Sequence, residues 1–366
     1  MLIYIVSFLL NMLVAFLLHF KRDGYFSMDE LDQNKRKKKI YLILTALQLG
    51  LLCGLRSEVM AYDTWAYRQI FDMCPDTWGT ILHNETYVEF GFGFLCSLIK
   101  ILGGNFQVLL LISGLFVMAS CCIFIYRHSN NVMLSVFIII SFPFFYSAFD
   151  IIRHFMATAF LLLGYKYVEE RKPIKYLIFI LLGSLFHIVS LLFLPLYFIK
   201  KIKWNWITAL GAAITTALLY VLIEPVAILI GNLLGKSNGI ASGWIGSFGG
   251  GIRTALMYAA IMVIAAWAYY RLRNRTRDDM TAMIWVLLML MFSILFINAR
   301  MMTRMIMTMV PFVAIAIPRL LDHKRMKSAM DYWILTGGFL VIGVIYHAFL
   351  LLTNWQHVVP YVPFWS

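Results

Sequence analysis

Hydrophobic residues are concentrated in about ten long runs, and Lys and Arg lie almost entirely between these runs. A helix that crosses a membrane needs roughly 20 apolar residues, within a range of about 17–25. Apart from two ambiguous stretches, the pattern predicts membrane-spanning helices at residues 2–20, 40–55, 105–126, 132–149, 152–168, 206–230, 253–270, 280–297, 304–321 and 332–352.

Composition supports this interpretation. Hydrophobic residues make up 62% of the 366 residues, and the mean hydropathy is +0.81. Soluble domains are about half apolar, and one soluble core cannot hide this much apolar surface. We therefore predict an all-α, polytopic transmembrane helical bundle of about ten full spans with added short or half-length helices, forming one integral membrane domain over residues 1–366.

Two apolar stretches are ambiguous. Residues 88–102 are short and contain Lys100, whereas residues 176–199 are interrupted by Gly183, Ser184 and His187. If neither stretch crosses the membrane, residues 176–199 form two half-length helices with His187 at the apex, and 88–102 is interfacial or re-entrant. If both cross, residues 103–175 invert.

The distribution of positive charge favours the first topology. The net charge is +13, and basic runs occur at residues 35–39, 166–175, 200–203, 271–277 and 324–327. Short basic loops stay in the cytoplasm, and without the two extra crossings all these runs fall on that side. The loops at 56–88 and 231–252 are then external, the second one being rich in Gly and Ser and expected to be mobile. The charge thus reports topology and does not suggest nucleic-acid binding.

Ionisable residues within or beside spans are costly and usually face a wet cavity. On the predicted outer side they occur in five segments: Arg56 and Asp63 after the second span, Glu89 before residues 90–102, Arg153 and His154 at the head of a span, His187 at the break, and Arg300 with Arg304. Arginine binds phosphate oxygens through a planar fork, and a carboxylate or imidazole beside it can take a proton from a sugar hydroxyl. The pattern predicts an external cavity for an anionic lipid diphosphate.

Structural alternatives exist for most of these residues. Arg56 and Arg68 would snorkel to the interface, Asp63 would cap a helix, and Glu89 would be a helix N-terminal charge. Asp150 would form an ion pair with Arg153, and His187 would hydrogen-bond a carbonyl freed by the break. Arg300 and Arg304 are harder to explain structurally, because like charges four residues apart repel one another.

Several other classes of site lack their motifs. There is no phosphate-binding loop, no dinucleotide fingerprint and no Cys/His spacing that suits zinc. Five cysteines are scattered along the chain, and Cys74 would pair with Cys96 only if both faced an oxidising compartment. We expect neither a cofactor nor a metal.

The same segments resemble the EpsG-like, Wzy-type bacterial polysaccharide polymerases over roughly residues 50–310. The resemblance is carried by LRSEVMAYD with AYRQIF, by VEFGFGFL, by IRHFMATAFLLLGYKY, by KYLIFILLGSLFHIVSLLFLPLYF and by the late arginine pair. Family members usually have glycine just before the first-loop aspartate, where this chain has Ala61 and Tyr62. They commonly have glutamine where this chain has His154.

The resemblance implies a metal-independent glycosyltransferase of the GT-C type in the bacterial cytoplasmic (inner) membrane, with its active site facing the exterior. Such an enzyme moves a growing glycan from undecaprenyl diphosphate to the next lipid-linked repeat unit and builds O-antigen, capsule or exopolysaccharide. Its partners are the lipid-linked donor and acceptor and membrane lipid, and its candidate protein partners are a chain-length regulator and a flippase.

Roles follow from matching each motif. Arg153, Arg300 and Arg304 would bind the diphosphate, with Arg56 as a weaker fourth ligand. Asp63 is the first choice for the general base, with Glu89, His154 and His187 as competitors. Two other functions remain open: a flippase or exporter of lipid-linked oligosaccharide, which would use the same basic cavity without chemistry, and a glycan ligase.

Overall fold

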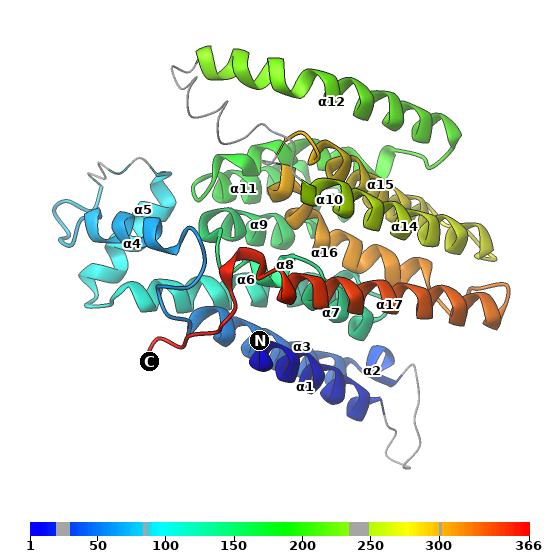
Figure 1. The fold of residues 1–366 in the computed structure, drawn as a ribbon, viewed down its shortest axis with the longest axis horizontal. Coiled ribbons are helices and arrows are strands. Elements are labelled where there is room, and N and C mark those ends of the chain that lie inside the picture. The colour runs from blue at the N-terminus through cyan, green and yellow to red at the C-terminus, as the bar shows by residue number, and fades with distance from the viewer. Residues whose placement is uncertain (20–29, 83–85, 87, 234–248, 300–301) are drawn as a thin grey trace. The chain divides into compact units, whose positions relative to one another are not determined.

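The computed structural model describes residues 1–19, 30–82, 86, 88–233, 249–299 and 302–366. Within these residues the chain is helical, and extended pairing is limited to two isolated bridges, Arg56 with Pro363 and Leu272 with Met326. The predicted all-α class is therefore confirmed for the described part of the chain (Figure 1).

The described chain divides into two compact units. Unit 1 comprises Met1–Tyr197 together with Tyr346–Ser366, and unit 2 comprises Phe198–Ile345. A helix, α17 (Ala329–Leu352), contains the boundary between Ile345 and Tyr346. The prediction of one integral membrane domain stays a prediction.

Unit 1 is built mainly from short helices. They are α1 (Leu2–Leu18), α2 (Glu30–Gln33), α3 (Lys35–Gly54), α4 (Thr64–Met73), α5 (Phe90–Ile101), α6 (Phe106–His128), α7 (Val132–Ser141), α8 (Phe144–Ser147), α9 (Ile152–Gly164), α10 (Lys166–Glu169), α11 (Pro173–Ser184) and the 3-10 helices η1 (Ile188–Lys201), which ends in unit 2, and η2 (Trp355–His357).

In unit 1, α3 packs closely along α6. A Cβ atom on Gly54 would lie 2.7 Å from the Cα atom of Leu111. Only a residue without a side chain permits this approach, and small residues allow the backbones of membrane helices to pack in this way. The packing fixes the C-terminal end of α3, where the 56–63 loop begins.

Unit 2 consists of longer helices: α12 (Trp206–Leu233), α14 (Gly249–Arg271), α15 (Arg277–Leu295), α16 (Met302–Leu320) and most of α17. α15 packs against α12, α14 and α16. Its Trp285 ring stacks on Phe312 of α16 with centroids 4.2 Å apart. α15 runs antiparallel to both α14 and α16. The end of α14, the start of α15 and the end of α16 therefore lie together.

Six of the described helices are long and apolar enough to cross a membrane: α6, α12, α14, α15, α16 and α17. The predicted count of ten full spans is therefore not confirmed, although the chain is a multi-pass membrane protein. α1 has only 17 residues, and α3 begins with the basic run 35–39. The predicted span 132–149 is interrupted beside Pro143, and the span 152–168 is divided between α9 and α10.

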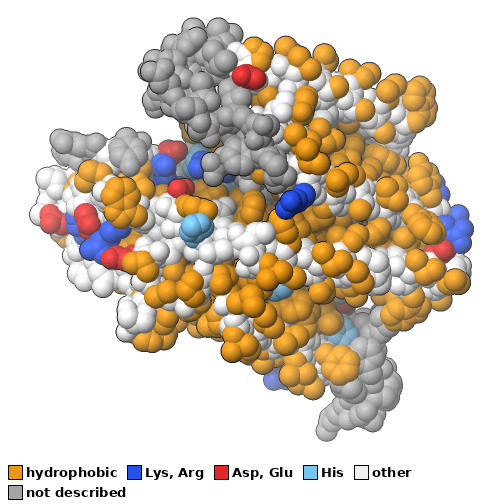
Figure 2. Space-filling view, in the orientation of Figure 1, with side chains coloured by type: hydrophobic (Ala, Val, Ile, Leu, Met, Phe, Trp, Pro, Cys, Tyr) orange, Lys and Arg blue, Asp and Glu red, His pale blue; other side chains and the backbone are white. Residues whose placement is uncertain are grey.

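The ambiguous stretch 176–199 contains the predicted break. α11 ends at Ser184, and η1 begins at Ile188, so His187 lies between two half-length helices. The stretch 88–102 forms α5, a helix of 12 residues. Most of the predicted loop 231–252 lies outside the described residues. Hydrophobic side chains dominate the visible surface of the helices, as lipid-facing surfaces require (Figure 2).

Candidate functional site

Arg153 and Glu89 form an ion pair at the heads of two helices of unit 1. Arg153 lies in the first turn of α9, and its Nη1 donates to Oε2 of Glu89 over 2.6 Å. The guanidinium also lies over the ring of Tyr67, 5.9 Å from its centroid. Both charged side chains are about one-fifth exposed, at 21% and 22%, so a ligand can reach the pair.

Glu89 also connects this pair to the helix break. Its Oε1 accepts a hydrogen bond from the backbone N–H of Ile188, the first residue of η1, over 3.1 Å. Gly91, two residues later, donates its N–H to the carbonyl of Leu185 over 2.8 Å. A Cβ on Gly91 would lie 2.8 Å from both the Cβ and the carbonyl oxygen of Leu185. The glycine therefore lets the start of α5 dock on the break.

The two histidines predicted as site residues meet beside Glu89. The rings of His154 and His187 are nearly perpendicular, with centroids 5.6 Å apart. His154 is 1% exposed and His187 is 9% exposed. Nδ1 of His187 accepts a hydrogen bond from the N–H of Val189 over 3.2 Å. Nδ1 therefore acts as an acceptor, which leaves Nε2 as the ring's donor.

His187 also approaches Glu89. Its Nδ1 lies 3.9 Å from Oε1 of Glu89, which is too long for a hydrogen bond. Because Nδ1 accepts from the Val189 amide, this nitrogen does not donate to a carbonyl freed by the break.

Asp63 stands at the N-cap position of α4, but its carboxylate does not cap the helix. Its backbone N–H donates to Oδ1 of Asp150 over 2.6 Å. Within the described part of the chain, its carboxylate takes part in neither a hydrogen bond nor an ion pair. Asp150 is 3% exposed. The predicted Asp150–Arg153 ion pair is not formed, because Arg153 pairs with Glu89 and Asp150 holds the loop.

Arg56 is buried behind this loop, at 1% exposure. Its Nη1 donates to the carbonyl of Cys53 and its Nη2 to the carbonyl of Phe149, and the guanidinium lies over the Phe149 ring. Burial lowers the pKa of the guanidinium, and the charge of Asp150 acts in the opposite direction. Snorkelling is therefore excluded for Arg56, which connects α3 to the segment before Asp150.

The C-terminal segment of unit 1 covers the same loop. Ser57 N–H donates to the carbonyl of Val362 over 2.8 Å, and Ala61 N–H donates to the carbonyl of His357 over 3.2 Å. The ring of Tyr62 lies against that of His357, with centroids 3.9 Å apart. Ala61 has a φ of +70°, in the left-handed region. Ala61, two residues before Asp63, thus has a backbone conformation that favours glycine, and the resembled family usually has a glycine just before this aspartate.

The structure therefore brings four predicted residues together in unit 1: Glu89, Arg153, His154 and His187. Asp63 is connected to them through the hydrogen bond of its backbone N–H to Asp150, three residues before Arg153. We call these five residues the Glu89 cluster. Arg304 lies in the first turn of α16 in unit 2, and Arg300 lies outside the described residues. The predicted convergence of all the arginines on one cavity stays a prediction. Sequence reasoning assigned no site role to Tyr67 or to the Ile188 amide, because nothing local marks them as neighbours of Arg153 and Glu89.

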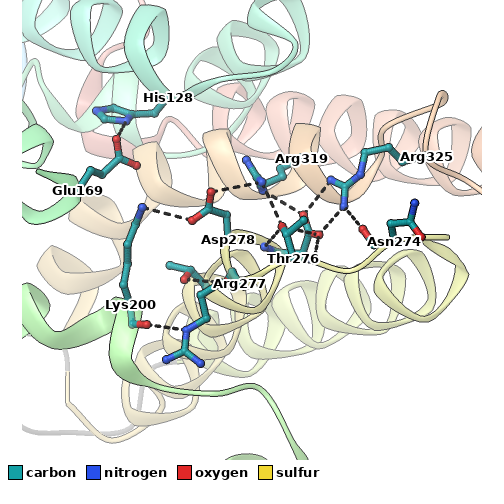
Figure 3. A network of polar contacts seen from close by, with 11 residues as sticks. His128, Glu169, Lys200, Asn274, Thr276, Arg277, Asp278, Arg319 and Arg325 are labelled. Carbon is teal, nitrogen blue, oxygen red and sulfur yellow. Dashed lines mark hydrogen bonds and ion pairs between the residues drawn. The ribbon is translucent and has the colours of Figure 1, made fainter.

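A second polar cluster lies in unit 2, where α15 begins and α16 ends (Figure 3). The carboxylate of Asp279 is fully buried and accepts hydrogen bonds from Arg319, Arg325 and Thr276. Thr276 and Asp279 also form a reciprocal capping box at the start of α15. Asp278 pairs with Lys200 and Arg319. We call Thr276, Asp278, Asp279, Arg319 and Arg325 the Asp279 cluster.

Comparison with known proteins identifies the family. No curated protein and no solved structure matches this chain. Residues 39–362 match the EpsG family. This range covers most of the chain and contains both clusters. The described residues contain no group of three or more His, Cys, Asp or Glu side chains arranged to hold a metal ion. This chain therefore belongs to the EpsG family and is a multi-pass membrane protein of polysaccharide biosynthesis.

Proposed function

We propose that the protein is a polysaccharide polymerase that transfers a growing glycan from undecaprenyl diphosphate to the next lipid-linked repeat unit. The observation that carries this proposal is the Glu89 cluster, in which a partly exposed arginine lies near carboxylates and imidazoles. This is the combination that a diphosphate leaving group and a sugar hydroxyl require.

The hydrogen bonds support different roles for the two carboxylates. Glu89 is occupied by Arg153 and by the Ile188 amide, so it orients the arginine. Asp63 is held through its own backbone amide, which leaves its carboxylate available as the general base. His154 and His187, whose ring centroids lie 5.6 Å apart beside Glu89, stay competing candidates for the base.

In the proposed reaction, Asp63 takes the proton from the acceptor hydroxyl as that oxygen attacks the anomeric carbon of the growing chain. The bond between that carbon and the phosphate oxygen breaks, and the diphosphate leaves on its lipid. Arg153 stabilises the charge that develops on the leaving group, with Arg300 and Arg304 as further proposed ligands. Arg56 is assigned to the scaffold, because its donors are used inside the protein.

We further propose that the Glu89 cluster faces the outside of the bacterial cytoplasmic membrane. Basic residues gather at the opposite side of the proposed topology, where Arg271, Arg275 and Arg277 flank the turn between α14 and α15 and Lys324–Lys327 follow α16. This supports a cytoplasmic location for that end of unit 2 under the positive-inside rule.

The proposal is tested by incubating the purified protein with synthetic repeat units linked to undecaprenyl diphosphate and resolving the products by size. Wild-type protein is expected to give a ladder of longer glycans on lipid. Arg153→Ala is expected to lower the rate of chain growth about 10²–10³-fold, the usual loss when one preorganised donor to a developing oxyanion is removed.

The matched control is Arg68→Ala. Arg68 is also on the 56–88 side of unit 1, but it is 44% exposed and pairs with Glu58 and Asp72. Its removal should leave the ladder intact. A ladder of wild-type intensity from folded Arg153→Ala would refute the role of Arg153. Transport of intact repeat units into vesicles without chain growth would refute the polymerase proposal in favour of an exporter.

A further inference from the structure

Two buried thiols come from neighbouring helices of unit 1. Cys74 follows the last residue of α4, and Cys96 lies in the middle of α5, which packs against α4. Both residues are almost completely buried, at 2% and 0% exposure. Lys100, one helical turn after Cys96, donates from its Nζ to the carbonyl of Cys74 over 2.5 Å, so the end of α4 is held against this part of α5. A disulfide requires two cysteines that the fold already brings close together.

The surroundings make the two sulfurs unequal. Interaction with Cys96 and the positive charge of Lys100 lower the pKa of the Cys74 thiol, while burial opposes them. Lys100 Nζ is held in place by the carbonyls of Cys74 and, over 3.0 Å, Asp72. In the folded protein Cys74 is therefore the more acidic thiol of the pair.

We propose that Cys74 and Cys96 form a disulfide bond that fastens α4 to α5. The inference rests on the outward orientation in the proposed function, because disulfides persist in oxidising compartments. The other cysteines are Cys53 in α3 and the neighbours Cys121 and Cys122 in α6. They lie within helices predicted to cross the membrane and are expected to remain thiols.

The bond forms by exchange with a disulfide-bearing protein of the same compartment. The Cys74 thiolate attacks that disulfide and forms a mixed disulfide, and one sulfur of the exchange protein leaves as a thiolate. The Cys96 thiolate then attacks the Cys74 sulfur and releases the second thiolate. The chain loses two electrons and two protons, and the exchange protein gains both as a dithiol. Because both sulfurs are buried in the folded protein, exchange takes place before α4 docks on α5. The contacts that distinguish the two thiols form only on docking, so the first attack is equally open to Cys96.

The bond would act on the site through position. It closes the segment 74–96, which contains Glu89, and it holds the end of the helix that carries Tyr67 beneath Arg153. Asp63 precedes the first residue of the same helix. Both carboxylates of the Glu89 cluster are therefore on segments that the disulfide connects, and neither cysteine contacts the substrate.

The experiment is differential alkylation of the full-length protein. Cells are quenched with acid, and the protein is denatured and treated with N-ethylmaleimide, then reduced and treated with iodoacetamide before peptide mass spectrometry. We expect iodoacetamide on Cys74 and Cys96, and N-ethylmaleimide on Cys53, Cys121 and Cys122, which are internal controls. N-ethylmaleimide on Cys74 and Cys96 would overturn the inference.

Two further measurements separate this inference from the proposed function. In the Cys74→Ser, Cys96→Ser double variant, Thr77→Cys places an exposed thiol in the same loop. Its reaction with an impermeant maleimide on intact cells is expected and reports the outward orientation, and no reaction would overturn the inference. A bonded pair in a protein that makes no glycan ladder would support the disulfide and refute only the polymerase.

Discussion

The Glu89 cluster and the Asp279 cluster contain the same kinds of side chains, yet they differ in how completely their polar atoms are used. Both oxygens of Asp279 accept hydrogen bonds, from Arg319, Arg325 and Thr276, and the side chain has no exposure. In the Glu89 cluster, Arg153 and Glu89 keep about one-fifth exposure. Nε of Arg153 has no acceptor within the described residues.

This difference indicates that the two clusters have different roles. A buried carboxylate surrounded by donors is fixed, and a ligand could enter only by displacing contacts that already compensate its charge. Arg153 is partly exposed, so its guanidinium can donate to a further acceptor such as a phosphate oxygen, whereas its Nε, unpaired in the described part of the chain, is buried. Ion pairing by itself therefore does not distinguish the two clusters, whereas the incomplete pairing and partial exposure of Arg153 do, and they support the proposed site.

The largest expected effect concerns the carboxylate of Asp63. Asp63→Asn keeps the backbone N–H that donates to Asp150 and removes only the basic oxygen. Loss of a general base typically costs 10²–10⁴-fold, so we expect chain growth to slow by about that factor. The rate is measured from the glycan ladder, and the folded fraction by size-exclusion chromatography. Glu58→Gln, at an exposed carboxylate of the same loop, is the control. Equal rates for wild type and folded Asp63→Asn would exclude Asp63 as the base.

The next largest effect concerns Asp279, whose two carboxylate oxygens both accept hydrogen bonds. Asp279→Ala leaves Arg319 and Arg325 without their shared partner. Removing one member of a buried pair costs about 3–5 kcal/mol, and we expect the lower end because both arginines remain about one-quarter exposed. The thermal midpoint of the detergent-solubilised protein should fall, while the rate of chain growth per folded molecule stays at the wild-type value.

Asp278→Ala provides the matched control for that loss. Asp278 is the neighbouring residue and is 48% exposed, where its pairs with Lys200 and Arg319 are screened by water. An exposed pair is worth about 0–1 kcal/mol. If the two variants lose equal stability, or if Asp279→Ala lowers the rate per folded molecule, the assignment of this cluster to structure alone is wrong.

Sequence reasoning predicted the parts of this comparison that are local. The break at His187 follows from Gly183, Ser184 and His187 in an otherwise apolar stretch, and the structure has it there. The partner of Arg153 was not predictable in this way. Asp150 lies three residues away and looked like the partner, whereas the structure uses Glu89, 64 residues away. That pairing depends on the docking of α5 on the break, which no local pattern encodes.

The number of membrane spans also shows what a local sequence pattern cannot predict. Hydropathy predicted a span over 132–149, but Pro143 lacks a backbone donor and the helix ends at Ser141. Family resemblance gave the segments of the proposed site in their order along the chain. It did not distinguish Arg56, which is buried among backbone carbonyls, from Arg153, because burial is a property of the folded chain.

A smaller effect tests the docking that orients Glu89. Gly91→Ala places a methyl group 2.8 Å from backbone and side-chain atoms of Leu185. Overpacking of this kind costs about 1–3 kcal/mol, and the shift would move the Glu89 carboxylate away from the Ile188 amide. We expect a lower thermal midpoint and slower chain growth together. Gly79→Ala is the control, since a Cβ there meets nothing within 4 Å. Unchanged stability and rate in Gly91→Ala would show that the close approach is not required.

The smallest effect concerns the loop that carries Asp63. Ala61 has a φ of +70°, and the left-handed conformation costs an L-residue about 1–2 kcal/mol. Glycine adopts it without that cost but loses more backbone entropy on folding, so we expect Ala61→Gly to stabilise the protein by about 0.5–1 kcal/mol. Ala66→Gly is the matched control, because Ala66 is inside α4, where glycine costs about 1 kcal/mol. The two substitutions are chemically identical and should shift the thermal midpoint in opposite directions. Shifts of the same sign would show that the 56–63 loop does not hold Asp63 in the conformation described. Asp63 would then lose its proposed role as the base of the Glu89 cluster.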